Sequence, residues 1–511
     1  MPGVDELDMT ARVDEIRGRW PCTGLAVGVV RDGSLEFFAG RGLADIASGT
    51  PVTQDTVFRV ASITKTFTAV AVMQLCEQGL IDLDAPASCY LRAYRLVPAR
   101  ASFPPATVRH LLTHTAGIGE VAHPSGVLRP DFGESVKPGR PVPSLAEYYR
   151  GALRIGAEPG TRFTYTNHGP ATLGQIVADV SGQPLDRYLH EHVFGPLGMA
   201  STGLVRADLP PSQLATGYTL RARGPRPVPY REMVTAGAAS ACSTPADMGR
   251  YLAALLGGGA NEHGSVLKPE TMATMFEPHY QPDPRIPGMG LAFFRGQAGG
   301  QLVAEHQGTM PGFDSQIFVA PGDGVGVMAF TNGARQAMLW LPGETAGLLS
   351  HLLGVPGEGI HTDVPHHPEI WGDICGWYYL PGPLTDVRLR GMLGAGVEVS
   401  ARRGQLWFRG LTPLPALYRG FPLHPDDNED PCVFRIDLSG SGIGTARVIF
   451  SHEPGAGTTA LHLDLMPLTL YKRPAAANPR RWATGALAAG AAAIAARQLG
   501  AARRRRRSAA G

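Results

Sequence analysis

The sequence predicts a mixed α/β domain followed by a smaller domain made of β-strands. Three observations support this prediction. Strand-like segments stand at both ends of residues 7–355, with helical patterns between them, which is typical of one mixed α/β unit. Residues 369–473 place apolar segments between Gly and Pro turns, which favours an antiparallel barrel or sandwich. The 511 residues also exceed the usual size of one hydrophobic core.

Periodicity and turn residues set the elements expected in the first domain. A helix over 64–78 is apolar on nearly all sides and is followed by Gly79, so we expect it to be buried at the centre of the domain. The other expected helices cover 108–113, 171–181, 185–193 and 245–256. The expected strands cover 24–30, 35–39, 57–60, 290–294, 316–320 and 326–331.

A linker rich in proline and histidine, residues 355–368, leads to the second domain. The strands expected there cover 377–380, 386–392, 397–401, 405–409, 433–438, 446–450 and 461–465. Four linker side chains could suggest a metal site, but they lack confirming ligands, so we expect a solvated linker and no metal. They are His361, Asp363, His366 and His367.

Residues 474–511 form a C-terminal tail of different composition. Residues 482–496 are mostly alanine and glycine, and residues 503–507 are an unbroken run of arginine. A spanning helix needs about 20 strongly apolar residues, which this segment does not supply. We therefore expect a loosely helical or disordered tail, with a weak contact to anionic membranes as the alternative.

Charge and cysteine usage limit the class of protein. The 46 basic and 44 acidic residues nearly balance, so we expect no nucleic-acid partner. The six cysteines show neither a C-x-x-C pair nor a metal-ligand spacing, and residues 1–20 lack the apolar core of a secretory signal. These observations predict a cytoplasmic protein with reduced thiols. Arginine greatly outnumbers lysine in this sequence. Because arginine cannot lose its proton in a protein and lysine can, a lysine kept at a given position can indicate that a removable proton is needed there.

Ser62 and Lys65 are the candidate nucleophile and base. They stand at i and i+3 where a strand meets the buried helix, so their side chains should share one face. The helix start offers free backbone N–H groups to a developing oxyanion. Burial disfavours the charged form of a lysine, whose pKa is ordinarily about 10.4, and a neutral Lys65 could take the proton of Ser62. A second S-x-x-K pair, Ser265 and Lys268, is rejected because Pro269 predicts a helix start that leaves Ser265 outside the helix.

Several segments, in order, resemble the serine β-lactamase and penicillin-binding-protein superfamily, and specifically its class-C-like branch of esterases and D-amino-acid peptidases. The resemblance covers roughly residues 10–350 and implies an antiparallel sheet flanked by helices. The matching segments are Phe58–Lys65 (FRVASITK), Val108–Gly117 (VRHLLTHTAG), Phe163–Asn167 (FTYTN), Gly195–Met199 (GPLGM) and His306–Phe313 (HQGTMPGF).

The resemblance also implies roles for individual residues. Tyr165 would share proton transfer with Lys65, as acid to the leaving group and later as helper of the attacking water. Asn167 would hydrogen-bond Lys65 or the substrate amide. Gly308 would leave room for substrate beside an edge strand, and the N–H of Thr309 would complete an oxyanion hole with that of Ser62.

His306 departs from the family pattern, because it stands where the K-T-G motif has lysine. Any grip on a substrate carboxylate is therefore expected to be weaker and dependent on pH. We expect a serine hydrolase that cleaves small-molecule esters or amides through an acyl-enzyme on Ser62, without cofactor. The alternatives are a β-lactamase or D,D-peptidase acting on a lactam or peptide, and an inactive scaffold of the penicillin-binding type.

Overall fold

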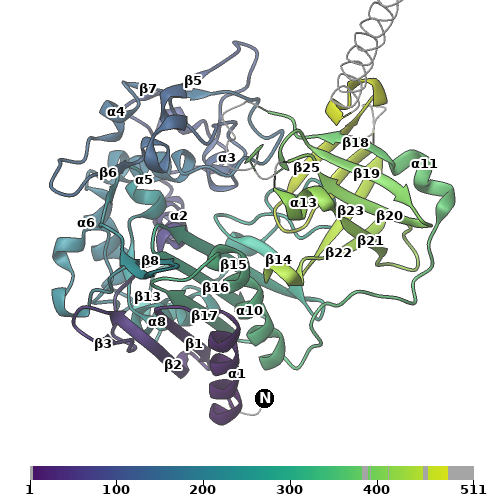
Figure 1. Cartoon of the computed structure of the whole chain (residues 1–511). Helices are drawn as coiled ribbons and strands as arrows, with labels where there is room; N and C mark the ends of the chain where they lie inside the picture. The colour runs from purple at the N-terminus through teal and green to yellow at the C-terminus, as the bar shows by residue number, and fades with distance from the viewer. Residues whose placement is uncertain (1–3, 383–389, 392, 413, 453–458, 481–511) are drawn as a thin grey trace, which may run out of the picture.

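The computed structural model describes residues 4–382, 390–391, 393–412, 414–452 and 459–480. Two bodies, a mixed α/β domain and a closed β-barrel, lie side by side in Figure 1. This confirms the expected combination of a mixed α/β fold with an all-β domain. The tail expected beyond residue 480, and all but two residues of the strand expected over 386–392, lie outside the described residues. Within the described residues, every helix is too short or too polar to cross a membrane.

The α/β domain is built on one antiparallel sheet of seven strands. In sheet order the strands are β14 (Phe294–Ala298), β15 (Gln301–Met310), β16 (Phe313–Ala320), β17 (Val325–Thr331), β1 (Gly24–Arg31), β2 (Ser34–Asp45) and β3 (Thr50–Pro51). Strand β1 pairs with β17 and β2, and all of its residues are buried. The two ends of the domain sequence therefore meet in the middle of the sheet.

Helices cover both faces of this sheet, as expected. One face carries α1 (Glu6–Arg19) and α10 (Ala337–Leu352), which share an apolar cluster with the sheet. The other face carries α8 (Pro245–Leu256), which packs against α2 (Thr64–Glu77) through Phe67 and Tyr251, whose ring centroids lie 4.5 Å apart. Residues 64–73 of α2 are buried without interruption, which confirms the predicted central helix.

Further elements complete the domain. They are β4 (Phe58–Arg59), β5 (Arg95–Pro98), α3 (Val108–Leu112), β6 (Ser135–Val136), α4 (Leu145–Tyr148), β7 (Ala152–Ile155), α5 (His168–Ser181), α6 (Leu185–Leu189), β8 (Tyr218–Arg221), β9 (Gly224–Pro227), β10 (Glu232–Met233), α7 (Ala236–Ala239), β11 (Cys242–Ser243), β12 (Ala260–Asn261), β13 (Gly264–Ser265) and α9 (Pro269–Phe276).

Two of the expected elements differ from the structure. The strand expected over 290–294 is a bend in which only Phe294 belongs to β14, and Ala292 has a φ of +63°, outside the strand region. The helix expected over 185–193 is α-helical only to Leu189 and continues as a π-helical turn. The apolar residues of the two segments gave the strand pattern and the helix pattern on which the predictions were based. The backbone conformation of both segments is set instead by the elements packed around them.

The second domain is an antiparallel barrel that closes because its last strand pairs with its first. Its strands are β18 (Gly376–Tyr379), β19 (Val397–Arg402), β20 (Gln405–Gly410), β21 (Phe421–Pro425), β22 (Val433–Asp437), β23 (Thr445–His452), β24 (Thr459–Leu463) and β25 (Leu468–Arg473), with α11 (Trp371–Ile374) before them and α13 (Pro415–Arg419) between β20 and β21. Its interior is filled with apolar side chains such as Tyr378, Leu406 and Leu470. Sequence patterns did not predict β21 or β25.

Specific contacts join the two domains. Arg285 of the α/β domain donates to Asp430 at 2.7 Å and to the carbonyl of Phe450 at 3.0 Å, both in the barrel. An apolar cluster crosses the same boundary, because Leu468 of β25 packs with Phe163 and Met289. The barrel is therefore held against the segment that leads to Tyr165.

Candidate active site

Ser62 lies in the short turn that joins β4 to α2. The preceding residue, Ala61, has a φ of +47°, a left-handed conformation that costs a residue with a Cβ about 1 kcal/mol. The turn is held by Thr64, whose Oγ1 donates to the Ala61 carbonyl at 2.5 Å and accepts from the Ala241 N–H at 3.0 Å. Ala61 and Ile63 are buried, whereas Ser62 is only partly buried. The strained turn therefore leaves Ser62 partly accessible between two buried neighbours.

Lys65 lies one turn along α2, and its ammonium nitrogen is directed at Ser62. The Nζ–Oγ distance is 2.9 Å, and Lys65 is 1% exposed. The same nitrogen donates to Oδ1 of Asn167 at 2.8 Å and to the carbonyl of Ala238 at 3.0 Å. In a neutral amine these two acceptors use both N–H bonds, which leaves the lone pair for the proton of Ser62. The predicted i, i+3 pairing is present in the structure.

Tyr165 lies beside this pair. Nζ of Lys65 is 4.9 Å from the centroid of the Tyr165 ring. The ring is packed between His114, at 4.6 Å between centroids, and Phe294, at 6.2 Å. The structure therefore brings together Ser62, Lys65 and Tyr165, three residues that lie in two distant segments of the sequence.

Asn167 connects Lys65 to a residue that sequence reasoning missed. Its Nδ2 donates to Oε2 of Glu134 at 2.8 Å, and Oγ1 of Thr235 donates to the same oxygen at 3.0 Å. Glu134 is 1% exposed. It lies in a loop without regular periodicity, and no local pattern in the sequence marks it.

Gly308 allows strand β15 to pass directly beside Ser62. A Cβ at this position would lie 2.2 Å from the Val60 carbonyl oxygen, 2.3 Å from Oγ of Ser315 and 3.1 Å from the backbone nitrogen of Ser62. The hydroxyl of Ser315, in the neighbouring strand β16, donates to the Val60 carbonyl at 2.9 Å and connects β16 to the turn. Thr309 follows Gly308 on β15 and is exposed. An oxyanion hole formed by the backbone N–H groups of Ser62 and Thr309 requires that β15 pass this close to the turn.

His306 lies in β15 and is buried. It is 1% exposed, and its Nδ1 lies 2.7 Å from the carbonyl of Gln307, which requires Nδ1 to carry the proton. Burial, and then the positive charge of Lys65, lowers the pKa of His306 to about 3. The ring is therefore neutral at ordinary pH, so this geometry does not support the expected pH-dependent grip on a carboxylate.

The second S-x-x-K pair is arranged differently. Ser265 lies in β13, whereas Lys268 is the residue before α9. The hydroxyl of Ser265 donates to the carbonyl of Leu267 at 3.0 Å. The two side chains do not share a helix face, so the rejection of this pair is confirmed.

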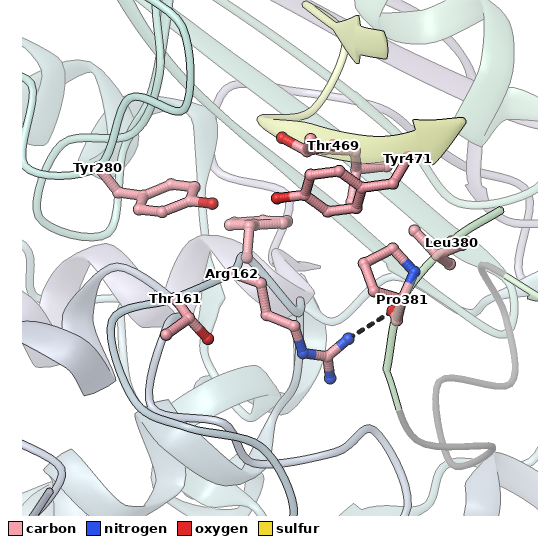
Figure 2. Close-up of a pocket in the computed structure, with 9 residues that line it drawn as sticks. Thr161, Arg162, Tyr280, Leu380, Pro381, Thr469 and Tyr471 are labelled. Atoms are coloured by element: carbon pink, nitrogen blue, oxygen red, sulfur yellow. Dashed lines mark hydrogen bonds between the residues drawn. The ribbon is translucent and has the colours of Figure 1, made fainter. Parts of the chain in front are cut away.

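The boundary between the domains passes close to Tyr165 but leaves little space. Arg162, Tyr280 and Tyr471 line a cavity of about 20 Å³ at this boundary. Figure 2 shows these side chains. Such a volume holds roughly one water molecule. Nη1 of Arg162 donates to the carbonyl of Pro381 at 2.7 Å across the boundary. This cavity is too small for an organic substrate. Nor does any group of three or more His, Cys, Asp or Glu side chains in the described part of the chain form a metal site.

Comparison with known proteins agrees with this geometry. A family model described as Beta-lactamase matches residues 11–347. The chain is 30% identical over 373 residues to the esterase EstB of Burkholderia gladioli, covering 66% of this chain and 93% of that protein. It is 28% identical over 389 residues to penicillin-binding protein 4 of Amycolatopsis lactamdurans, covering 70% of this chain and 96% of that protein. The structure of an octameric penicillin-binding protein homologue from Pyrococcus abyssi superposes with a TM-score of 0.59 at 22% identity, over 92% of this chain and 100% of that one, and so shares the fold.

Proposed function

The chain belongs to the β-lactamase family, and on that premise we propose that it hydrolyses ester or amide bonds of small molecules through an acyl-enzyme on Ser62. The observation that carries the proposal is the 2.9 Å contact between Lys65 Nζ and Ser62 Oγ in a buried setting. A buried lysine at this distance is within reach of the proton that it would abstract.

Acylation would move two protons, one from Ser62 to Lys65 and one from Tyr165 to the leaving group. Neutral Lys65 takes the proton of Ser62 while Oγ attacks the carbonyl carbon of the substrate. The oxyanion is stabilised by the backbone N–H groups of Ser62 and Thr309. Tyr165 delivers a proton to the leaving alcohol or amine, and the bond to the leaving group breaks.

Deacylation would reverse these roles with water as the nucleophile. Tyr165, which gave up its proton in acylation, accepts a proton from the attacking water, the ester bond to Ser62 Oγ breaks, and Lys65 returns its proton to Ser62. Asn167 keeps Lys65 directed at the serine in both steps through its 2.8 Å hydrogen bond. The cycle consumes one water for each bond hydrolysed.

The state of His306 supports ester and amide substrates over penicillins. A penicillin carries a carboxylate beside the scissile bond, and a cationic side chain at position 306 would attract it. His306 instead offers a buried neutral ring, because burial and Lys65 lower its pKa to about 3. We therefore propose that β-lactam hydrolysis is the weaker activity.

Hydrolysis of p-nitrophenyl acetate and butyrate, measured beside nitrocefin, tests the proposal. Turnover of the esters should disappear in Ser62→Ala and persist in Ser265→Ala, which removes the serine of the second S-x-x-K pair. Nitrocefin turnover of comparable efficiency would instead favour a β-lactamase or D,D-peptidase. An inactive scaffold would neither hydrolyse these substrates nor react with a fluorophosphonate probe.

A further inference from the structure

Glu134 is an anionic side chain placed inside the protein by an unfavourable turn. The three residues before it, Asp131, Phe132 and Gly133, have φ values of +49°, +52° and +82°. Two of them carry a Cβ, and consecutive left-handed residues of that kind persist only where surrounding structure holds them. The turn ends at Glu134, and the Val234 N–H donates to the Glu134 carbonyl at 2.8 Å beside the β6–β10 pair.

The carboxylate of Glu134 faces hydrogen-bond donors on one side and a histidine on the other. Oε2 accepts from Asn167 and Thr235, whereas Oε1 accepts no hydrogen bond from the described residues and lies 3.9 Å from Nε2 of His168. Burying a carboxylate costs several kcal/mol unless its partners compensate. A neutral glutamine could accept the same two hydrogen bonds, so hydrogen bonding alone does not require a charge here.

The charge has a consequence for the amide of Asn167. An amide can turn by 180° and exchange its oxygen and nitrogen, and its partners decide which orientation is stable. A carboxylate can only accept hydrogen bonds, so Nδ2 of Asn167 must face Glu134. Oδ1 is then fixed toward Lys65, where it accepts the 2.8 Å hydrogen bond.

The other donor to Glu134, Thr235, lies at the turn that carries the second acceptor of Lys65. Thr235 precedes α7, and its carbonyl accepts from the Ala238 N–H at 2.8 Å. The Ala238 carbonyl is the other acceptor of the Lys65 amine. Glu134 therefore contacts Asn167, which bonds Lys65, and Thr235, whose turn is closed by its own backbone hydrogen bond.

We propose that Glu134 is a positioning residue, which fixes the amide of Asn167 so that Lys65 is directed at Ser62. The proposal rests on the proposed function only in taking Ser62 and Lys65 as the reacting pair. It predicts that the effect of Glu134 on Ser62 passes through Asn167. A residue that merely supports the loop would affect the protein equally whether or not Asn167 is present.

A double-mutant cycle on Glu134 and Asn167 tests this. The measured quantity is the second-order rate constant for labelling of Ser62 by a fluorophosphonate, with thermal unfolding recorded for every variant. Glu134→Gln should label about 10-fold more slowly, a change that corresponds to about 1.4 kcal/mol. In the Asn167→Ala background the same substitution should change the rate by less than about 2-fold. Glu158→Gln removes an exposed carboxylate and should label like the wild type.

Each other outcome has a defined meaning. Wild-type labelling of the Glu134→Gln variant, or an equal loss in both backgrounds, would overturn the proposal while leaving the proposed function intact. A wild-type protein that does not label at Ser62 would overturn both. If Glu134→Gln does not fold, Thr235→Val replaces it in the cycle, because it removes one hydrogen bond to Oε2. It should slow labelling about 2- to 5-fold in the wild type and have no effect when Asn167 is alanine.

Discussion

Replacing Gly308 with alanine tests whether the close approach of β15 to Ser62 creates the reactive site. The new Cβ would lie 2.2 Å from the Val60 carbonyl oxygen and 2.3 Å from Oγ of Ser315, closer than real Cβ contacts allow. The strand must therefore move away from Ser62 by a sizeable fraction of an ångström. A 1 Å misplacement in a catalytic site costs on the order of 100-fold in rate, and loss of one oxyanion donor costs about 100- to 1,000-fold. We expect kcat for p-nitrophenyl acetate to fall by at least about 100-fold.

The matched control is Gly296→Ala in the neighbouring strand β14. A Cβ at Gly296 meets nothing closer than the Val303 carbonyl oxygen at 4.0 Å, so this variant should keep wild-type kcat. Thermal unfolding separates a local shift from general unfolding, because overpacking at Gly308 should lower the stability by about 1–3 kcal/mol and leave a cooperative transition. A folded Gly308→Ala variant with kcat within about threefold of the wild type would refute the reasoning.

Three further changes probe the base, the buried histidine and the domain boundary. Lys65→Arg keeps the charge but cannot lose a proton, so ester turnover should fall by about 100- to 10,000-fold in steady-state assays. Burial and the charge of Lys65 lower the pKa of His306 to about 3. The unfolded protein takes up a proton on His306 near pH 6.5, whereas the folded protein does so only near pH 3, so the stability linked to this ring is complete above pH 6.5 and is lost as the pH falls toward 3. His306→Gln should therefore reduce the slope of the free energy of unfolding against pH by up to about 1.4 kcal/mol per pH unit, as measured by urea titrations. Arg285→Ala removes the 2.7 Å ion pair with Asp430 across the boundary and leaves the buried carboxylate of Asp283 without its 2.7 Å partner, so it should lower the stability by about 2 kcal/mol. Arg187→Ala, in an exposed pair, should leave the stability almost unchanged.

The results that would contradict these expectations are equally specific. Retention of a tenth of the ester turnover by Lys65→Arg would exclude Lys65 as the base. An unchanged pH profile in His306→Gln would mean that His306 titrates alike in the folded and unfolded protein. Equal losses of stability in the Arg285 and Arg187 variants would show that the boundary contact contributes no more than a surface ion pair.

Local patterns in the sequence were sufficient to predict the proximity of Ser62 and Lys65 and the buried helix. Ser62 and Lys65 are one helical turn apart, so their proximity follows from helix geometry alone. Tyr165 and Asn167 required the ordered motifs of the resemblance, because about a hundred residues separate them from Lys65. Glu134 could not be predicted in either way. It reaches Asn167 from a loop whose conformation depends on the pairing of β6 with β10.

Missed strands have a similar physical explanation. Strand β15 carries His306, Gln307 and Gly308, and its apolar residues are too few for local periodicity to mark a strand. Strand β21 (Phe421–Pro425) contains two prolines, which ordinarily argue against a central strand. Its pairing with β20 and β22 is imposed by closure of the barrel. Closure depends on strands far apart in the sequence, so a local pattern cannot predict it.

The barrel is best understood as part of the surroundings of Tyr165. Leu468 of the barrel is buried in one cluster with Phe163, and Tyr165 packs against that cluster two residues further along the chain. The proton transfer proposed for Tyr165 needs a ring in a fixed position, and one support of this ring comes from the second domain. Movement of the barrel away from Phe163 would free the Phe163–Tyr165 segment without disturbing Lys65 in α2 or Ser62 in the turn before it. Loss of the boundary contacts should therefore reduce proton delivery to the leaving group while Ser62 remains able to react with a fluorophosphonate, whose fluoride leaving group needs little assistance from an acid.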